Sequence, residues 1–298
     1  MERLGLGPSP LLELNKRLIY ARLTGFGQDG PYSRKAGHDL NYLAISGVLS
    51  LFCNNGRPTA PINILADFAG GGMACAMGIL IALIERSRSN LGQVVDVSMV
   101  EGVRYISSYM WHTQKDQAPA RQFIWPNHGK KEANLLDGGA HFYTVYETKD
   151  KRWISVGSIE PQFYSSLLNV LGLDEHSYPQ FDIQNWAKFK ELFAKLFITK
   201  SLAEWTELFK DADACVEPVL EYYETEENDK LKARNSFNLD HTPKPSPLLS
   251  RTPAEPNLIE PGENEHTADV LREIGYGERE ILQLSKDGAI DCGLEAKL

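Results

Sequence analysis

The chain has 298 residues, enough for about two domains of ordinary size, and its 42% hydrophobic and 24% charged residues are typical of a globular protein. A net charge of −9 excludes a general affinity for nucleic acid, which requires a basic face. The four scattered cysteines form no C-x-x-C pair, so we predict neither a disulfide framework nor a metal site. The most apolar run, residues 74–84, is shorter than the ~20 residues that cross a bilayer, so we predict no membrane span.

The first part of the chain alternates predicted strands and helices. Residues 17–27 are typical of a buried strand that leads into a Gly-rich turn, and apolar residues at helical spacing follow over 37–51. We predict a long helix over about 66–88, a β-branched strand over 92–100 and a second amphipathic helix over about 100–114.

A different pattern follows the linker that we predict over residues 116–140. Residues 141–159 form a predicted hairpin with a Lys-Asp-Lys turn, and a capping box of Ser201 and Glu204 opens one of the later helices. The other predicted elements of this block are helices at 161–171, 185–198 and 201–210 and a strand at 214–220. Six prolines over 241–256 predict an extended strap, and short helices are predicted at 267–275 and 278–286.

The stretch "AGHDLNYLAISG" places His38 and Asp39 at the start of a predicted helix. Asp39 is explained by capping, because a carboxylate at a helix start accepts backbone N–H bonds. An imidazole with a pKa near ~6.5 can exchange a proton at neutral pH, although a single histidine is more often structural.

Two further carboxylates lie at helix starts. Asp67, in "ILADFAGGGMACAMG", is either an N-cap or a group that faces a ligand channel. Three consecutive glycines are costly in a helix, at ~1 kcal/mol each relative to alanine, so we expect a ligand or another helix to approach closely there. Glu160 ends a predicted strand before Pro161, where a surface cap and a cleft carboxylate both fit.

The combination of these motifs resembles the α-methylacyl-CoA racemases of the family III CoA-transferases. The resemblance rests on "RLIYARLTGFGQDGP", "AGHDLNYLAISGVLS", "APINILADFAGGG", "GQVVDVSMVEG", "NLLDGGAHFYTVYET", "VGSIEPQFY" and "DACVEPVL". It implies an α/β fold with an incomplete Rossmann-like large domain and a smaller α+β domain, in the family III CoA-transferase fold. We therefore expect three parts, residues 1–125, 126–225 and 226–298, the last returning to the large domain.

The resemblance also implies a reaction in branched-chain fatty acid and bile acid metabolism. A 2-methylacyl-CoA thioester loses and regains its α-proton through an enolate-like state, with His38 on one face and Asp67 on the other. Glu160 is expected to hydrogen-bond and orient His38. No cofactor is expected, because CoA enters as part of the substrate. Residues expected to line the CoA site are Arg3, Gly37, Asp39, Leu40, Asn41 and Tyr42.

The resemblance predicts a homodimer, because family dimers interlock so that the small domain of one chain completes the site of the other. Relatives carry about 80 further residues before "MERLGLGP", the first strands of a Rossmann-like half, so we also expect an exposed sheet edge. Alternative readings are a CoA-transferase that uses Asp67 as nucleophile and a shortened, non-catalytic form. The C-terminal tripeptide Ala296-Lys297-Leu298 is close to the S-K-L signal, which predicts an import receptor as partner and a peroxisomal location; the resemblance also allows a mitochondrial one.

Overall fold

The computed structural model describes residues 1–256 and 261–292. They fall into two compact units, Met1–Val219 and Leu220–Leu298, each of which is described by itself. The predicted three-part division stays a prediction.

The first part of the Met1–Val219 unit contains a two-stranded parallel sheet. Strand β1 (Tyr20–Thr24) pairs with β4 (Val94–Ser98), with Tyr20 opposite Val94 and Thr24 opposite Ser98. Parallel sheets usually have both faces covered by helices. This sheet has two strands among the described residues, and several of their side chains are partly exposed. The predicted strands at 17–27 and 92–100 and the exposed sheet edge are confirmed.

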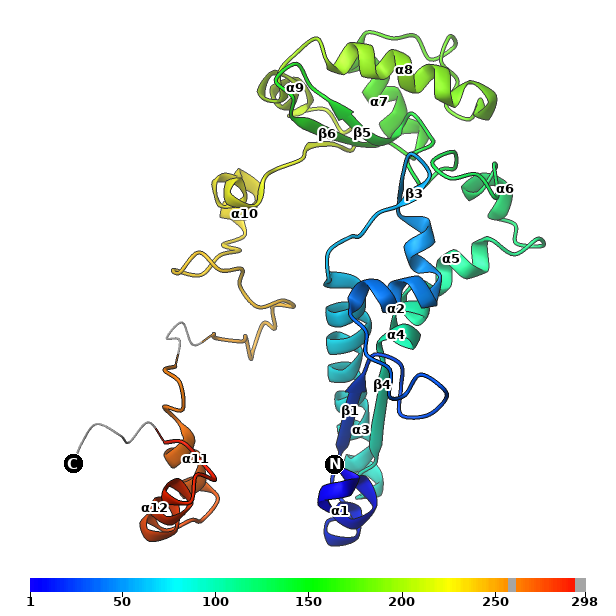
Figure 1. The fold of residues 1–298 in the computed structure, drawn as a ribbon. Helices are drawn as coiled ribbons and strands as arrows, with labels where there is room; N and C mark the ends of the chain where they lie inside the picture. Colours follow the sequence, from blue (N-terminus) through cyan, green and yellow to red (C-terminus); the bar gives the residue numbers. More distant parts are fainter. Residues whose placement is uncertain (257–260, 293–298) are drawn as a thin grey trace. The chain divides into compact units, whose positions relative to one another are not determined.

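Helices precede, connect and follow these two strands along the chain (Figure 1). Before or within the β1–β4 crossover lie η1 (Glu2–Leu4), α1 (Pro8–Leu14), α2 (Asp39–Ser46), η2 (Val48–Leu51), the short strands β2 (Cys53–Asn54) and β3 (Arg57–Pro58), η3 (Ile64–Met73) and α3 (Ala74–Ser89). After β4 come α4 (Met99–Ile106), α5 (Ser108–Thr113) and α6 (Arg121–Ile124). The predicted single helix over 100–114 was wrong in one respect: it breaks at Ser107 into α4 and α5.

Helices η3 and α3 form one continuous helix, as predicted, but its first ten residues have π-helical geometry. The η3–α3 helix packs on α4 through glycines: a Cβ atom added at Gly102 would lie 1.8 Å from the carbonyl oxygen of Gly70. By length and composition Ile64–Ser89 could cross a membrane, a test that core helices of soluble proteins also pass. The predicted absence of a membrane span stays a prediction.

The second part of the unit is a three-stranded antiparallel sheet covered by helices. Strand β6 (Trp153–Gly157) lies between β5 (Tyr143–Glu147) and β7 (Val216–Pro218). The associated helices are α7 (Pro161–Leu171), η4 (Ile183–Asn185), α8 (Trp186–Phe197) and α9 (Leu202–Phe209). The predicted hairpin, three helices and last strand are all confirmed, including the capping box of Ser201 and Glu204.

The Leu220–Leu298 unit is made of short elements joined by extended chain. Its described helices are η5 (Tyr222–Glu227), α10 (Asp229–Ala233), α11 (Thr267–Glu273) and α12 (Glu278–Lys286). The last two confirm the predicted helices at 267–275 and 278–286. The strap predicted over 241–256 contains no helix or strand in the described chain.

Candidate active site

The loop between β1 and α2 is folded around the ring of Tyr42. A Cβ atom at Gly25 would lie 2.2 Å from this ring and one at Gly37 would lie 2.8 Å from it, so both positions require glycine. The Tyr42 hydroxyl donates a hydrogen bond of 2.5 Å to the carbonyl of Gly37. Phe26 packs edge-on against the same ring, with the centroids 5.0 Å apart. These contacts fix the chain immediately before His38.

His38 is the N-cap residue of α2 and has an extended backbone conformation. Its backbone N–H donates to Oδ1 of Asn41 at 3.1 Å, which closes the start of the helix. Its side chain is exposed and makes no side-chain cap hydrogen bond to α2. The imidazole is therefore available to a ligand.

Asp39 does cap a helix, but not its own. The carboxylate is 3% exposed, and its Oδ2 accepts hydrogen bonds from the backbone N–H groups of Ala66 (2.7 Å) and Asp67 (2.9 Å). The prediction that it caps α2 was wrong, because Asn41 closes that helix while Asp39 faces the start of η3.

Asp67 lies in the first part of η3 and is half-buried. Burial raises the pKa of the Tyr42 hydroxyl, and the negative charge of Asp67 raises it further. The hydrogen bond from the Asp67 N–H to Asp39 places Asp67 beside the start of α2, the helix to which Tyr42 also belongs. His38, Asp39, Tyr42 and Asp67 thus belong to one local structure.

The glycines after Asp67 have a packing explanation. A Cβ atom at Gly70 would lie 2.7 Å from the Val103 nitrogen, and one at Gly71 would lie 3.1 Å from Cγ of Met99. Both contacts belong to α4, so the approach of another helix explains these two positions. Gly72 is exposed, and a Cβ atom there would be 3.6 Å from the carbonyl of Asp67.

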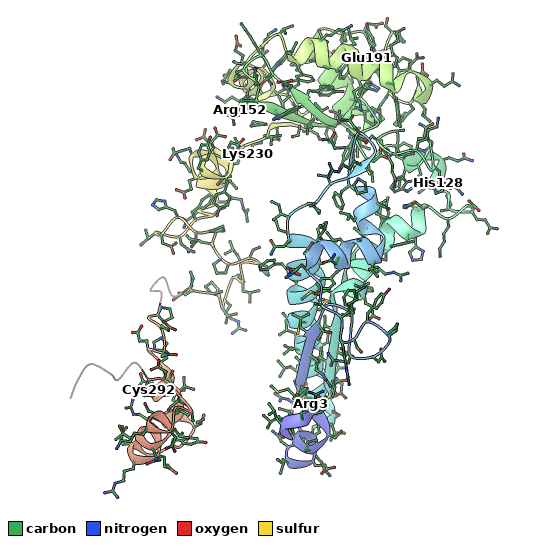
Figure 2. The ribbon with its side chains drawn as sticks, viewed as in Figure 1. Arg3, His128, Arg152, Glu191, Lys230 and Cys292 are labelled. Atoms are coloured by element: carbon green, nitrogen blue, oxygen red, sulfur yellow. The ribbon has the colours of Figure 1, made fainter. Side chains whose placement is uncertain are left out.

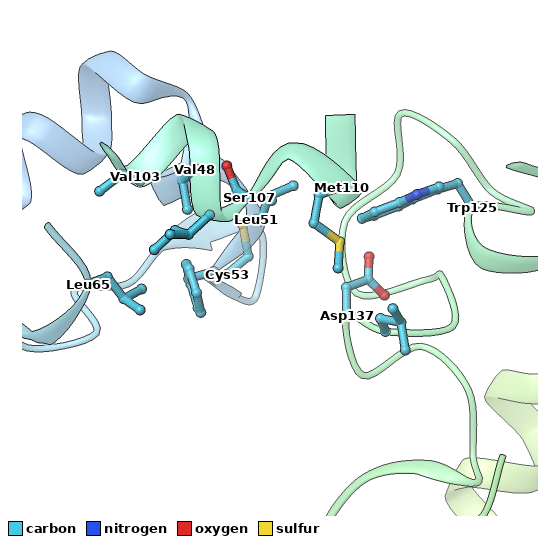
Figure 3. Close-up of a pocket in the computed structure, with 12 residues that line it drawn as sticks. Val48, Leu51, Cys53, Leu65, Val103, Ser107, Met110, Trp125 and Asp137 are labelled. Atoms are coloured by element: carbon cyan, nitrogen blue, oxygen red, sulfur yellow. The ribbon is translucent and has the colours of Figure 1, made fainter. Parts of the chain in front are cut away.

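An apolar cavity of about 510 Å³ borders η3 and α4 (Figure 3). Leu65, two residues before Asp67, and Val103 lie at one end and Trp125 at the other, with Met110 between them. Asp137 also lines the cavity, and its carboxylate accepts hydrogen bonds from the backbone and side-chain N–H groups of Asn134 at 2.7 and 2.8 Å. The sequence analysis did not predict this cavity. The helical spacing of Val103, Ser107 and Met110, which all line it, was the feature of the sequence that could have indicated it.

Glu160 is exposed and is the N-cap residue of α7, with Pro161 at the first helical position. Burial raises the pKa of the Cys215 thiol, and the charges of Asp213 and Glu160 raise it further, so Glu160 lies near β7. The described part of a single chain contains no hydrogen bond between Glu160 and His38. Within the described residues, one chain therefore unites two of the three predicted catalytic residues in a local structure, and the third is not hydrogen-bonded to His38.

The remaining predicted site residues fall into three groups. Leu40 and Asn41 are exposed in the first turn of α2, next to Gly37 and Tyr42. Arg3 is exposed in η1, beside α1 (Figure 2). Ala296, Lys297 and Leu298 lie outside the described residues. Within the described ranges, no group of three or more His, Cys, Asp or Glu side chains could hold a metal ion.

Comparison with known proteins identifies clear relatives. Residues 1–267 match the family model described as CoA-transferase family III. An α-methylacyl-CoA racemase of Mus musculus is 49% identical over 298 residues, and that of Homo sapiens is 48% identical; each match covers 98% of this chain and 76% of the relative. The crystal structure of a CAIB/BAIF family protein from Brucella suis has a TM-score of 0.69 and 22% identity, covering 92% of this chain and 72% of the other. The mixed α/β fold predicted from sequence is confirmed.

Proposed function

This chain belongs to CoA-transferase family III, and we propose that it is an isomerase that interconverts (2R)- and (2S)-2-methyl-branched acyl-CoA thioesters. The observation that carries this function is the identity of 49% and 48% to two α-methylacyl-CoA racemases over nearly the whole chain. Its substrate is an acyl-CoA, and CoA takes part as a portion of that substrate.

The reaction requires two proton carriers, one for each face of the α-carbon. His38 serves one face, because its imidazole is exposed and its backbone is fixed at the start of α2. Asp67 serves the other face from η3, whose start is bonded to the residue after His38. The N–H groups of Asp39 and Leu40 at the start of α2 can stabilise the negative charge that develops on the thioester oxygen, because the first N–H groups of a helix have no partner within it.

Glu160 orients His38 across a homodimer. Both side chains are exposed at helix N-caps, and within the described chain they are not bonded to each other. A second copy can therefore supply the carboxylate that holds the imidazole in one tautomer. The apolar side chains exposed on α3 supply surface of the kind that an interface between copies buries.

The apolar cavity beside η3 supports an acyl substrate. Its volume of about 510 Å³ is within the ~300–1,000 Å³ range of small-molecule sites. Its apolar lining suits a hydrocarbon chain, since each buried methylene contributes about 0.8 kcal/mol. Leu65 brings one end of the cavity close in sequence to Asp67, which suits a substrate whose reacting carbon lies beside its chain.

The same proposal extends to location. The C-terminal tripeptide Ala296-Lys297-Leu298 would be read by the peroxisomal import receptor, which recognises such a free terminus. In such a location the enzyme would supply one epimer of its product to the oxidation of branched acyl chains.

Deuterium wash-in tests the racemase function. The purified chain is incubated in D₂O with one epimer of a 2-methylacyl-CoA, and α-carbon labelling and inversion are followed together. We expect inversion that falls by at least ~10²-fold in His38→Gln and is unchanged in His176→Gln, an exposed control histidine. Inversion that is insensitive to His38→Gln, or labelling that is absent from a cooperatively folded wild-type protein, would contradict the proposal and favour acyl transfer through Asp67.

A further inference from the structure

A buried carboxylate connects the two helices that carry the proposed proton carriers. Asp39 follows His38 directly, and its Oδ2 accepts the backbone N–H groups of Ala66 at 2.7 Å and Asp67 at 2.9 Å. We propose that the Asp39 side chain is a positioning group, which holds the first turn of η3 so that Asp67 stands opposite His38. This proposal rests on the racemase function and adds to it a role separate from the predicted contact between residues 37–42 and the thioester.

Helix η3 needs an external cap. In a π-helix each N–H bonds to the carbonyl five residues earlier, so the first five N–H groups have no partner within the helix. The N-cap residue of η3, Asn63, contributes no side-chain hydrogen bond. Asp39 satisfies two of these groups, and one of them is the N–H of Asp67 itself. The backbone of Asp67 is thereby fixed relative to the start of α2.

The start of α2 does not need this carboxylate. Oδ1 of Asn41 already accepts the backbone N–H of His38 at 3.1 Å. The other carboxylate oxygen of Asp39, Oδ1, is buried and has no hydrogen-bond partner within the described residues. Both hydrogen bonds of this side chain are thus directed to η3.

The spacing between the two carriers is what this bond controls. A displacement of about 1 Å in a reacting group can cost about 10²-fold in rate. We therefore expect Asp39→Ala to lower kcat by about 10²-fold, with a much smaller change in KM. Asp39→Asn retains an oxygen that can accept both N–H groups, so it should recover kcat to within about 10-fold of the wild type.

The two epimers, tested separately in D₂O, distinguish positioning from a general structural role. In Asp39→Ala, inversion should fall for both substrate epimers, because inversion needs both proton carriers. Exchange with retention should persist for the epimer whose α-proton faces His38, because the imidazole alone can remove the proton and return a deuteron. The epimer that faces Asp67 should lose both exchange and inversion. His38→Gln should reverse this pattern: the epimer that faces Asp67 should keep exchange with retention, and the epimer that faces His38 should lose exchange and inversion.

Amide hydrogen exchange tests the bond without reference to activity. Asp39→Ala should speed exchange of the Ala66 and Asp67 amides, whereas Ser201→Ala, which removes the N-cap bond of the distant helix α9, should not. Unchanged amide exchange in η3, or an equal loss of labelling from both epimers, would overturn the proposal. A wild-type chain that labels neither epimer would instead contradict the racemase function, and the amide measurement would still decide whether Asp39 holds η3.

Discussion

Two regions of the Met1–Val219 unit bury their apolar side chains very differently. The aromatic region, residues 124–218, has a continuous core in which Phe142, Tyr164, Phe193 and Phe197 are fully buried. The site region, residues 20–113, has a small core around Leu43, Ala66 and Val103 and exposes much of α3. The aromatic region is therefore stable through its own packing, whereas the site region presents apolar surface that a further partner surface would cover.

Two leucines in helices provide the sharpest test of this difference. Leu167 in α7 is 0% exposed and Leu80 in α3 is 60% exposed. Leu167→Ala should lower the free energy of unfolding by ~2–5 kcal/mol, because it leaves a cavity, and Leu80→Ala should change it by no more than ~0.5 kcal/mol at protein concentrations too low for copies to associate. Urea unfolding of both variants at several protein concentrations measures this. A larger loss in Leu80→Ala that appears as the protein concentration rises would mean that a second copy covers the α3 face.

A buried histidine makes the aromatic region sensitive to acid. His141 is 0% exposed, Nε2 is 2.8 Å from the Tyr164 hydroxyl, and that hydroxyl donates to the carbonyl of Tyr178. Burial lowers the pKa of His141 from 6.5 to about 3. Between these values the unfolded chain binds the proton and the folded chain does not, so stability is lost as pH falls below 6.5.

The loss from His141 between pH 7 and pH 5 should be about 2 kcal/mol, since each unit of pKa difference corresponds to about 1.4 kcal/mol. Thermal or urea unfolding across this range measures it. His141→Phe should flatten the dependence, while the exposed-site variant His176→Gln should leave it unchanged. An equally steep profile in His141→Phe would contradict burial of a neutral imidazole.

The aromatic region was predicted from sequence more completely than the site region. Its hairpin, three helices and last strand follow from alternation, helical spacing and a capping box, which are local signals. The π-helix η3, by contrast, is bonded at its start to Asp39 and packed through Gly70 against Gly102, and both of these partners are distant from it in sequence. For the same reason the sequence indicated His38, Asp39 and Asp67 as separate helix starts without revealing the bond between two of them.

Two glycines at the η3–α4 contact should respond to alanine with opposite signs, the smallest effects expected here. A Cβ atom at Gly102 would lie 1.8 Å from the backbone oxygen of Gly70, so Gly102→Ala should separate the helices at a cost of ~1–3 kcal/mol. Gly72 is exposed and has room for a methyl group, so Gly72→Ala should gain ~0.5–1 kcal/mol from helix propensity. Unfolding measurements on both variants decide the point. If both substitutions are destabilising, the glycine at position 72 is needed for a contact outside this chain, which would place a partner surface next to Asp67.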